Sequence, residues 1–222
     1  MEKVLVVSVH PDDETIGCGG TILKHKLSGD KIYWLILTNV DTLNGWKNEI
    51  VVNRQKEIEN VASSYGFDKI FKLDFPTTKL DQIPRNLQIE KISKVINDVK
   101  PSIVYLVNRS DVHTDHQIGF QSVYSCTKNF RYPFIKRILM YECLSETEFS
   151  PSTSENAFIP NVYVDITDFF QKKIEIIKIY NSEVMKDFYP RSLNNIEALA
   201  KIRGSRIGKK YAEAFVLLLD IL

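Results

Sequence analysis

The sequence has few cysteines and almost no net charge. Its three cysteines, Cys18, Cys126 and Cys143, are widely spaced and form no C-x-x-C pair, which argues against a disulfide framework or a thiolate zinc site. The 29 basic and 28 acidic residues leave a formal charge of +1, so we do not expect the strongly basic surface of a nucleic-acid-binding protein. A small anionic molecule held by one or two arginines is still compatible with this balance.

Long apolar runs are also missing. No run approaches the roughly 18 residues of a membrane helix, and the apolar start at residues 4–7 is too short for a signal-peptide core. We therefore expect no membrane span and a reducing, cytoplasmic location. The 222 residues are 44% hydrophobic, as in a packed domain, and no repeat or linker divides them, so we predict a single domain over residues 1–222.

Segments typical of strands alternate with segments typical of helices. The expected strands are short apolar runs at residues 3–9, 31–38, 70–75 and 103–107. Their apolarity is continuous rather than alternating, which indicates strands covered on both faces, as in a parallel sheet. Strands alternating with helices indicate βαβ units. The predicted fold class is therefore α/β, a Rossmann-like, doubly wound, mostly parallel sheet with helices on both faces.

An acidic loop follows the first expected strand. It reads H-P-D-D-E at residues 10–14 and is followed by a glycine cluster at residues 17–20. In a parallel sheet such a loop lies at the carboxyl end, where ligands bind. The glycines predict a tight turn into a helix that begins near Thr21. A phosphate-binding reading is weak, because Ile22 stands where G-x-G-x-x-G needs its third glycine.

A second loop, "SDVHTDH" at residues 110–116, follows a later strand and holds two of the four histidines. His10 and Asp13, three positions apart, can bind one ion together with an imidazole from this second loop. Two imidazoles and one carboxylate are typical of catalytic zinc and of non-haem Fe(II). His25, between two lysines, is assigned to a helix surface.

Other side chains in the two loops remain free for proton transfer. Asp12 can accept a proton from a metal-bound water, and His113 or Asp115 can act on the leaving group. The set fits metal-assisted hydrolysis, in which the ion polarises a carbonyl and acidifies its water.

Taken together, the motifs resemble those of the PIG-L/LmbE-like family of N-acetylglucosaminyl deacetylases. H-P-D-D-E stands at residues 10–14 and H-x-D-H at 113–116. Residues 53–67 resemble the R-x-x-E helix of the family, and residues 203–215 resemble its C-terminal stretch. The resemblance spans the chain and implies a zinc-dependent hydrolase that cleaves the acetamide of an N-acetylated sugar or sugar conjugate, releasing acetate and a free amine.

The resemblance also implies roles for individual residues. One ion, Zn²⁺ or alternatively Fe²⁺, would have three protein ligands: His10, Asp13 and His116. Asp12 would be the general base, and His113 would act as the acid or stabilise the tetrahedral intermediate, with Asp115 orienting it. Family members often assemble, which by analogy implies a homo-oligomer. Glu183 departs from the glutamine expected in a Ser-Gln pair, so any substrate contact at that position is open.

Three further residues are candidates for substrate binding. On a helix over residues 49–65, Arg54 falls inside the apolar stripe. A buried guanidinium is costly unless it is paired, so we predict that it points at a carboxylate or at an anionic group of a ligand. The alternative is that it extends past the stripe into water. Tyr189 and Arg191, in the stretch at residues 187–192, are candidates for contacting a sugar or phosphate.

Two alternative functions fit the same motifs. A non-haem Fe(II) oxygenase could use the same two histidines and carboxylate, but it would leave Asp12 and His113 without a role. A non-catalytic nucleotide-binding or regulatory domain could use the acidic loop only to turn the chain. The second alternative predicts that no metal binds tightly.

Overall fold

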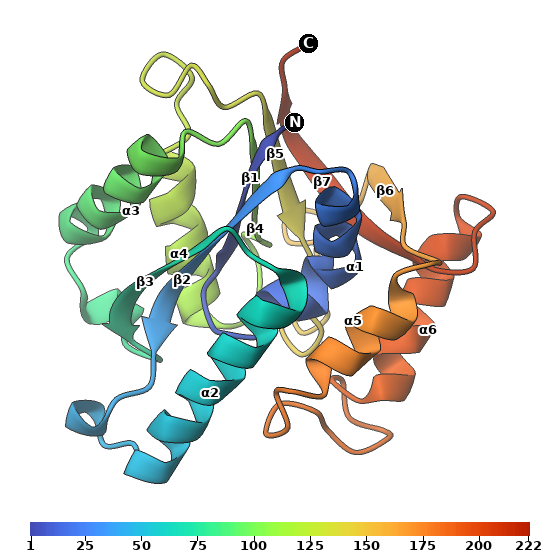
Figure 1. The fold of residues 1–222 in the computed structure, drawn as a ribbon, viewed down its shortest axis with the longest axis horizontal. Coiled ribbons are helices and arrows are strands. Elements are labelled where there is room, and N and C mark those ends of the chain that lie inside the picture. The colour runs from blue at the N-terminus through green and yellow to red at the C-terminus, as the bar shows by residue number, and fades with distance from the viewer.

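The computed structural model describes all residues, 1–222. Its strands are β1 (Lys3–Ser8), β2 (Lys31–Asn39), β3 (Lys69–Pro76), β4 (Ile103–Val107), β5 (Arg137–Tyr141), β6 (Val162–Asp165) and β7 (Ala212–Asp220). They form one sheet in the order β3-β2-β1-β4-β5-β7-β6 (Figure 1). The first five strands in this order are parallel to one another, and β7 runs antiparallel to both β5 and β6.

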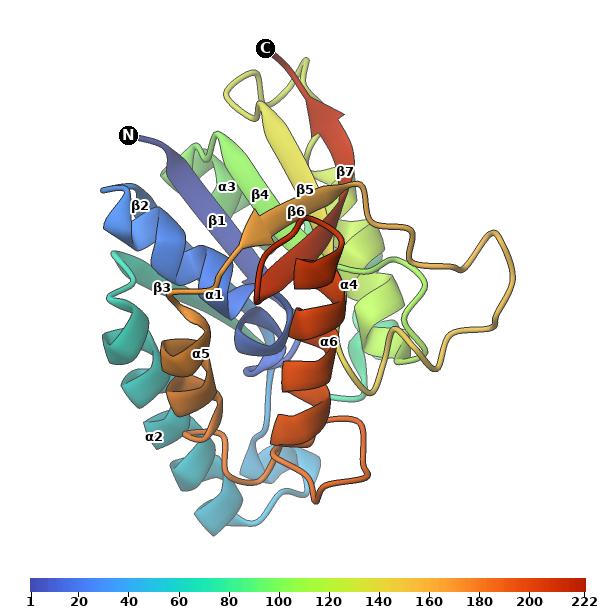
Figure 2. The same ribbon diagram turned by 90° about the vertical axis from the view of Figure 1, so that its right-hand side faces the viewer.

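Helices cover both faces of this sheet. They are α1 (Asp13–Leu27), α2 (Asn48–Tyr65), α3 (Arg85–Val99), α4 (Thr114–Ser125), α5 (Phe170–Ile177) and α6 (Leu193–Ser205). In Figures 1 and 2, α3 and α4 cover one face, and α1, α2, α5 and α6 cover the other. None of these helices combines the length and the apolarity that a membrane span requires. The predicted mostly parallel α/β architecture is confirmed.

The strand β1 lies at the centre of the core. Its residues Val4 to Val7 are at most 2% exposed, and they pair in parallel with β2 on one side and β4 on the other. The continuous apolarity of these strands in the sequence is explained by helices packed on both faces. All four strands expected from the sequence are present.

The helix α1 begins at Asp13, so the prediction of a start near Thr21 is wrong. The glycines lie inside the helix and permit close packing instead of forming a turn. A Cβ atom on Gly17 would lie 2.2 Å from the Tyr141 ring, and one on Gly20 would lie 2.7 Å from the Ile166 side chain. The helix is interrupted in the middle of this glycine cluster, where one residue has non-helical dihedral angles.

A buried ion pair satisfies the backbone groups that this interruption leaves open. The Nζ atom of Lys173 donates to the carbonyl of Ile16 at 2.8 Å, and the N–H groups of Gly20 and Thr21 donate to the Glu213 carboxylate at 2.8 and 2.7 Å. Lys173 and Glu213 themselves lie 2.7 Å apart and are each 4% exposed. Two distant residues therefore hold the two halves of α1 together.

His25 was expected on a helix surface; it lies on α1, but its ring is largely buried and hydrogen-bonded. Its side chain is 18% exposed; the Nδ1 atom lies 2.8 Å from Asp30 and the Nε2 atom 2.9 Å from the Tyr105 hydroxyl. The flanking lysines gave no sign of these two partners, one of which is 80 residues away along the chain. His25 is a hydrogen-bonded structural histidine, remote from the acidic loop.

Candidate active site

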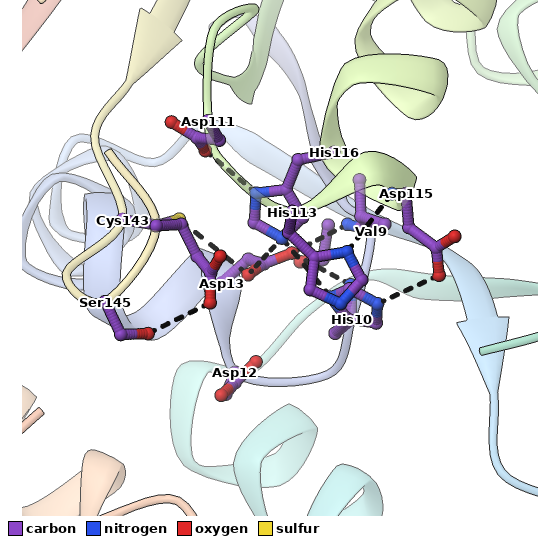
Figure 3. Close-up of polar contacts among 12 residues, drawn as sticks. Val9, His10, Asp12, Asp13, Asp111, His113, Asp115, His116, Cys143 and Ser145 are labelled. Atoms are coloured by element: carbon purple, nitrogen blue, oxygen red, sulfur yellow. Dashed lines mark hydrogen bonds and ion pairs between the residues drawn. The ribbon is translucent and has the colours of Figure 1, made fainter. Parts of the chain in front are cut away.

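The loops after β1 and β4 meet at the carboxyl end of the sheet. The chain leaves β1 toward β2 on one side, while β4 pairs with β1 on the other, so the order of strands reverses here. Such a reversal is the usual ligand-binding place of a doubly wound sheet. His10 from the first loop and His116 from α4 face each other across it, with Nδ1 of His10 3.2 Å from Nε2 of His116 (Figure 3).

Asp13 completes a set of three donors with these histidines. One of its oxygens lies 3.3 Å from Nε2 of His116, and the other accepts the backbone N–H groups of Val9 and His10 at 2.9 and 2.8 Å. One ligand atom from each of the three residues lies within 4.8 Å of the others. Ligands 2.0–2.1 Å from a tetrahedral zinc ion are about 3.3 Å apart, so the two measured separations fit such an ion.

Each histidine of this set is also held from its other ring nitrogen. Nδ1 of His116 lies 2.8 Å from Asp111, and Nε2 of His10 lies 3.3 Å from Asp115. This is the carboxylate–histidine arrangement that orients metal ligands. Asp115 also accepts backbone N–H groups at 2.6 and 3.0 Å from residues 78 and 80. Its carboxylate therefore positions His10 and not His113, the ring that the family resemblance implied.

Two other residue groups have ligand atoms equally close together. One combines His10 with His113 and Asp115, and the other combines His116 with Asp111 and Cys143. Each includes an aspartate that does not line the cavity described below. The set of His10, Asp13 and His116 lines that cavity with all three members, so it is the set best placed to bring an ion to a substrate.

His113 is the N-cap of α4. Its Nδ1 atom accepts the backbone N–H of Asp115 at 3.1 Å, which leaves Nε2 to carry the proton of the neutral ring. Burial is the main cause that lowers the pKa of His113 to about 4, and the nearby rings of His10 and His116 lower it further. The neutral ring can donate one hydrogen bond into the site.

Asp12 has an unusual backbone conformation, with φ 146° and ψ −28°. Residues with a Cβ atom rarely adopt such angles, and they persist only where the surroundings impose them. Here its N–H donates to Glu14 at 3.2 Å, and its carboxylate accepts from Nη1 of Arg191 at 3.2 Å. Burial, followed by the charges of Asp13 and Glu183, raises the pKa of Asp12.

Glu14, the fifth residue of the H-P-D-D-E motif, had no role assigned from the sequence. It is fully buried, and burial raises its pKa to about 7. Its carboxylate accepts the hydroxyls of Ser8, Thr15 and Tyr180 at 3.0, 2.7 and 2.9 Å. Because it also accepts the N–H of Asp12, Glu14 fixes the strained loop that presents Asp12.

A cavity of about 410 Å³ opens over these residues. Its lining includes the three donors, Asp12 and His113, and Trp46 and Ile50 contribute apolar surface. The cavity lies in the usual size range of small-molecule sites. Tyr189 does not line it: this side chain is 49% exposed and packs against Phe188, with ring centroids 4.5 Å apart.

Arg54 and Arg191 do reach the cavity, and both are paired with carboxylates. Arg54 contacts Glu183 and lies 3.3 Å from Glu57, and its Nη1 atom donates to the carbonyl of Pro11 at 2.9 Å. The prediction that Arg54 points at a carboxylate is confirmed. The carboxylate comes from the segment between α5 and α6, 129 residues along the chain.

A model of the PIG-L family, described as GlcNAc-PI de-N-acetylase, matches residues 5–127. The chain belongs to the PIG-L family. It is thus a hydrolase of amide C–N bonds, as predicted, and the oxygenase and non-catalytic alternatives do not apply.

Individual relatives extend the match beyond that range. Diacetylchitobiose deacetylase of Thermococcus kodakarensis is 29% identical over 96% of this chain and 82% of its own length. A probable N-acetyl-alpha-D-glucosaminyl L-malate deacetylase of Bacillus cereus is 24% identical over 90% of this chain and 94% of its own. The structure of N,N'-diacetylchitobiose deacetylase from Pyrococcus horikoshii superimposes with a TM-score of 0.75, at 25% identity, over 98% of this chain and 84% of that one.

Proposed function

We propose that the chain is a zinc-dependent N-deacetylase that hydrolyses the acetamide of an N-acetylated sugar of the N-acetylglucosamine type. One observation carries the proposal. Donor atoms of His10 and Asp13 lie 3.2 and 3.3 Å from the same nitrogen of His116, and all three residues line one cavity with Asp12 and His113. These separations fit a tetrahedral ion with a position left for a reactant.

His10, Asp13 and His116 would hold the zinc, and Asp111 and Asp115 would fix the two imidazoles. When bound, zinc supplies an acidified water and polarises the substrate carbonyl. Fe²⁺ prefers similar ligands and is the alternative ion.

Asp12 and His113 would handle the protons. The Asp12 carboxylate lines the cavity beside the donor set and is held by Arg191, so it can accept a proton from the attacking water. His113 keeps its proton on Nε2 because Nδ1 is occupied by the start of α4. That N–H can stabilise the developing oxyanion or protonate the leaving nitrogen. The products are acetate and a free amine.

The names of the relatives support a sugar as the substrate. Both matched relatives are described as deacetylases of N-acetylated sugars or their conjugates. The cavity combines Asn39, Thr77 and Thr78 with the partly exposed ring of Trp46, a mixture suited to the hydroxyls and the apolar face of a pyranose.

The test combines metal analysis with an acetate assay. Wild type, His10→Ala and the control His25→Ala are purified, loaded with zinc, dialysed and analysed for zinc per chain. We expect about one ion in the wild type and in the control, and its loss in His10→Ala. Acetate should be released from N,N'-diacetylchitobiose only by the two proteins that keep zinc. Zinc retained in His10→Ala would overturn the proposed donor set, and no acetate from the loaded wild type with this or any other N-acetylglucosamine-type sugar tested would overturn the deacetylase function.

A further inference from the structure

The cavity contains a second charged group besides the metal donor set. Glu183 lies between Arg54 and Arg191, with one oxygen contacting Arg54 and the other 3.1 Å from Nη2 of Arg191. These three side chains are between 12% and 21% exposed, so water screens them only in part. Nη1 of Arg191 continues the chain of contacts to Asp12 at 3.2 Å.

Both guanidinium groups are paired with carboxylates of the protein itself, and the buried Nε atom of Arg191 is left without a hydrogen-bond partner. Arg54 is paired with Glu57 and Glu183, and Arg191 with Asp12 and Glu183. The cavity lining includes no other lysine or arginine, and Glu146 adds a further carboxylate. The protein groups of the cavity therefore offer no unpaired cation to an anionic substrate.

The charge of Glu183 is the one that an anionic substrate would meet between the two arginines. Burial alone would raise its pKa, but the charges of Arg54 and Arg191 outweigh burial and lower the pKa overall. The carboxylate therefore stays ionised at neutral pH. A second carboxylate or a phosphate brought next to it would face a like charge and would find both arginines already bound.

The position of this group places it near the reacting part of a sugar. In an N-acetylglucosamine-type substrate the acetamide is on C2, so the substituent on C1 is its immediate neighbour. Asp12, which must approach the acetamide, is bonded directly to Arg191, which in turn is bonded to Glu183. We take the substrate to bind with C1, and not C3, on the Arg191 side of Asp12, which places the C1 substituent next to the Arg54–Glu183–Arg191 group.

On the basis of the proposed deacetylase function, we propose that Glu183 is a specificity-determining residue that selects N-acetyl sugars with an uncharged C1 substituent over those with an anionic one. The two relatives represent these alternatives, since diacetylchitobiose is uncharged and a malate conjugate carries carboxylates. By this assignment the chain acts on the first class. The residue does not take part in the chemical step; it closes an anion site that two arginines would otherwise form.

The test compares kcat/KM for uncharged and anionic substrates with the same reacting group. N-acetylglucosamine and N,N'-diacetylchitobiose form the first pair; N-acetylglucosamine 1-phosphate and the L-malate glycoside form the second. For the zinc-loaded wild type we expect the better uncharged substrate to exceed the better anionic one at least tenfold. In Glu183→Gln this ratio should fall at least tenfold, because the cavity loses a negative charge and each guanidinium loses one of its two carboxylate partners.

Two variants separate charge in the cavity from general effects. Glu183→Asp keeps the carboxylate and should keep the wild-type preference within about threefold. Glu57→Gln removes a charge from the same Arg54 but outside the cavity lining, and it should also leave the ratio within about threefold. Far-ultraviolet circular dichroism and melting curves report whether each variant is folded.

The outcomes distinguish this inference from the function on which it rests. No acetate from any of the four substrates would contradict the deacetylase proposal itself. Acetate from uncharged substrates with an unchanged ratio in folded Glu183→Gln would overturn the role of Glu183 alone. The wild-type measurement is decisive even if Glu183→Gln does not fold, because a preference for the anionic substrates would overturn the inference.

Discussion

The two halves of the chain contribute different things to one cavity. The proposed metal ligands and both carboxylates that hold their rings lie between residues 10 and 116, within the range matched by the family model. Glu183 and Arg191, which set the charge of the cavity, come from the segment between α5 and α6, outside that range. The residues proposed for the chemical step thus lie within the range of the family model, whereas Glu183, proposed to select substrates, lies outside it and is linked to Asp12 through Arg191.

The largest expected effect comes from removing the base in the first half. In Asp12→Asn the carboxylate proposed to accept the proton is gone, while the three proposed metal ligands remain. We expect kcat to fall roughly 10²–10⁴-fold, the usual contribution of general base catalysis. Zinc content, measured alongside, should stay at the wild-type value. A variant that loses zinc would show that Asp12 is itself a metal ligand and not a separate general base.

The next prediction tests how far the second half supports the first. Lys173→Met leaves Glu213 buried without its counter-charge and the carbonyl of Ile16 without a donor. We expect the free energy of unfolding to fall by about 3–5 kcal/mol, as for other broken buried pairs. Urea denaturation measures it. The neighbouring Lys172→Met is the matched control: its exposed pair with Glu175 should contribute below about 1 kcal/mol.

A smaller effect is expected from a residue that acts on the metal only through a ligand. Asp111 is fully buried and holds Nδ1 of His116 at 2.8 Å. Asp111→Asn should weaken zinc affinity roughly 10–100-fold, the usual range for such outer partners. Competition with a chromophoric chelator measures the affinity, and the exposed Asp98→Asn is the control. Unchanged affinity would mean that the His116 ring is oriented by packing alone.

The smallest effect concerns acid stability at the amino end of strands β2 and β3, where Asp68 lies. Asp68 accepts the backbone N–H of Ile32 at 2.9 Å and contacts Lys26. Burial is the largest single influence and raises the pKa of Asp68, but the hydrogen bonds from Ile32 and Lys26 and the charge of Lys26 together lower it overall. A lowered carboxyl pKa gives stability that is present above about pH 3.9 and is lost as pH falls through the folded-state value.

Asp68→Asn should therefore lose less stability than the wild type between pH 5 and pH 2. At pH 7 the expected cost is below about 1 kcal/mol, because both partners are partly exposed. Urea midpoints across that pH range measure the difference. Parallel curves for the two proteins would show that Asp68 titrates alike in the folded and unfolded states.

Sequence patterns were informative wherever the structure depends on local order. Continuous apolar runs predicted the central parallel strands, and the two short motifs predicted which loops meet. The helical stripe predicted that Arg54 needs a partner. Each of these inferences uses residues within one element or one loop, where periodicity and spacing carry the information.

Contacts between distant segments were not predictable in the same way. The carboxylate of Asp115 contacts the His10 ring instead of the His113 ring, because the relative position of the β1 and β4 loops decides which ring it meets. The glycines of α1 were predicted to form a turn, because nothing in the local sequence indicates that Tyr141 and Ile166 pack against them. Asp111 had a weak signal, as it lies in the "SDVHTDH" loop five residues before His116.

The interrupted helix α1 has a consequence for the order in which this protein is completed. Thr21 is made early in synthesis, but Glu213, which accepts its N–H, follows 192 residues later. During translation, nearly the whole chain must be made before the backbone N–H groups at the interruption of α1 can pair with Glu213. Domains generally fold as units, so the nascent chain should gain its metal site only as the last strand leaves the ribosome. A truncated product would then lack a finished site, although it contains every ligand.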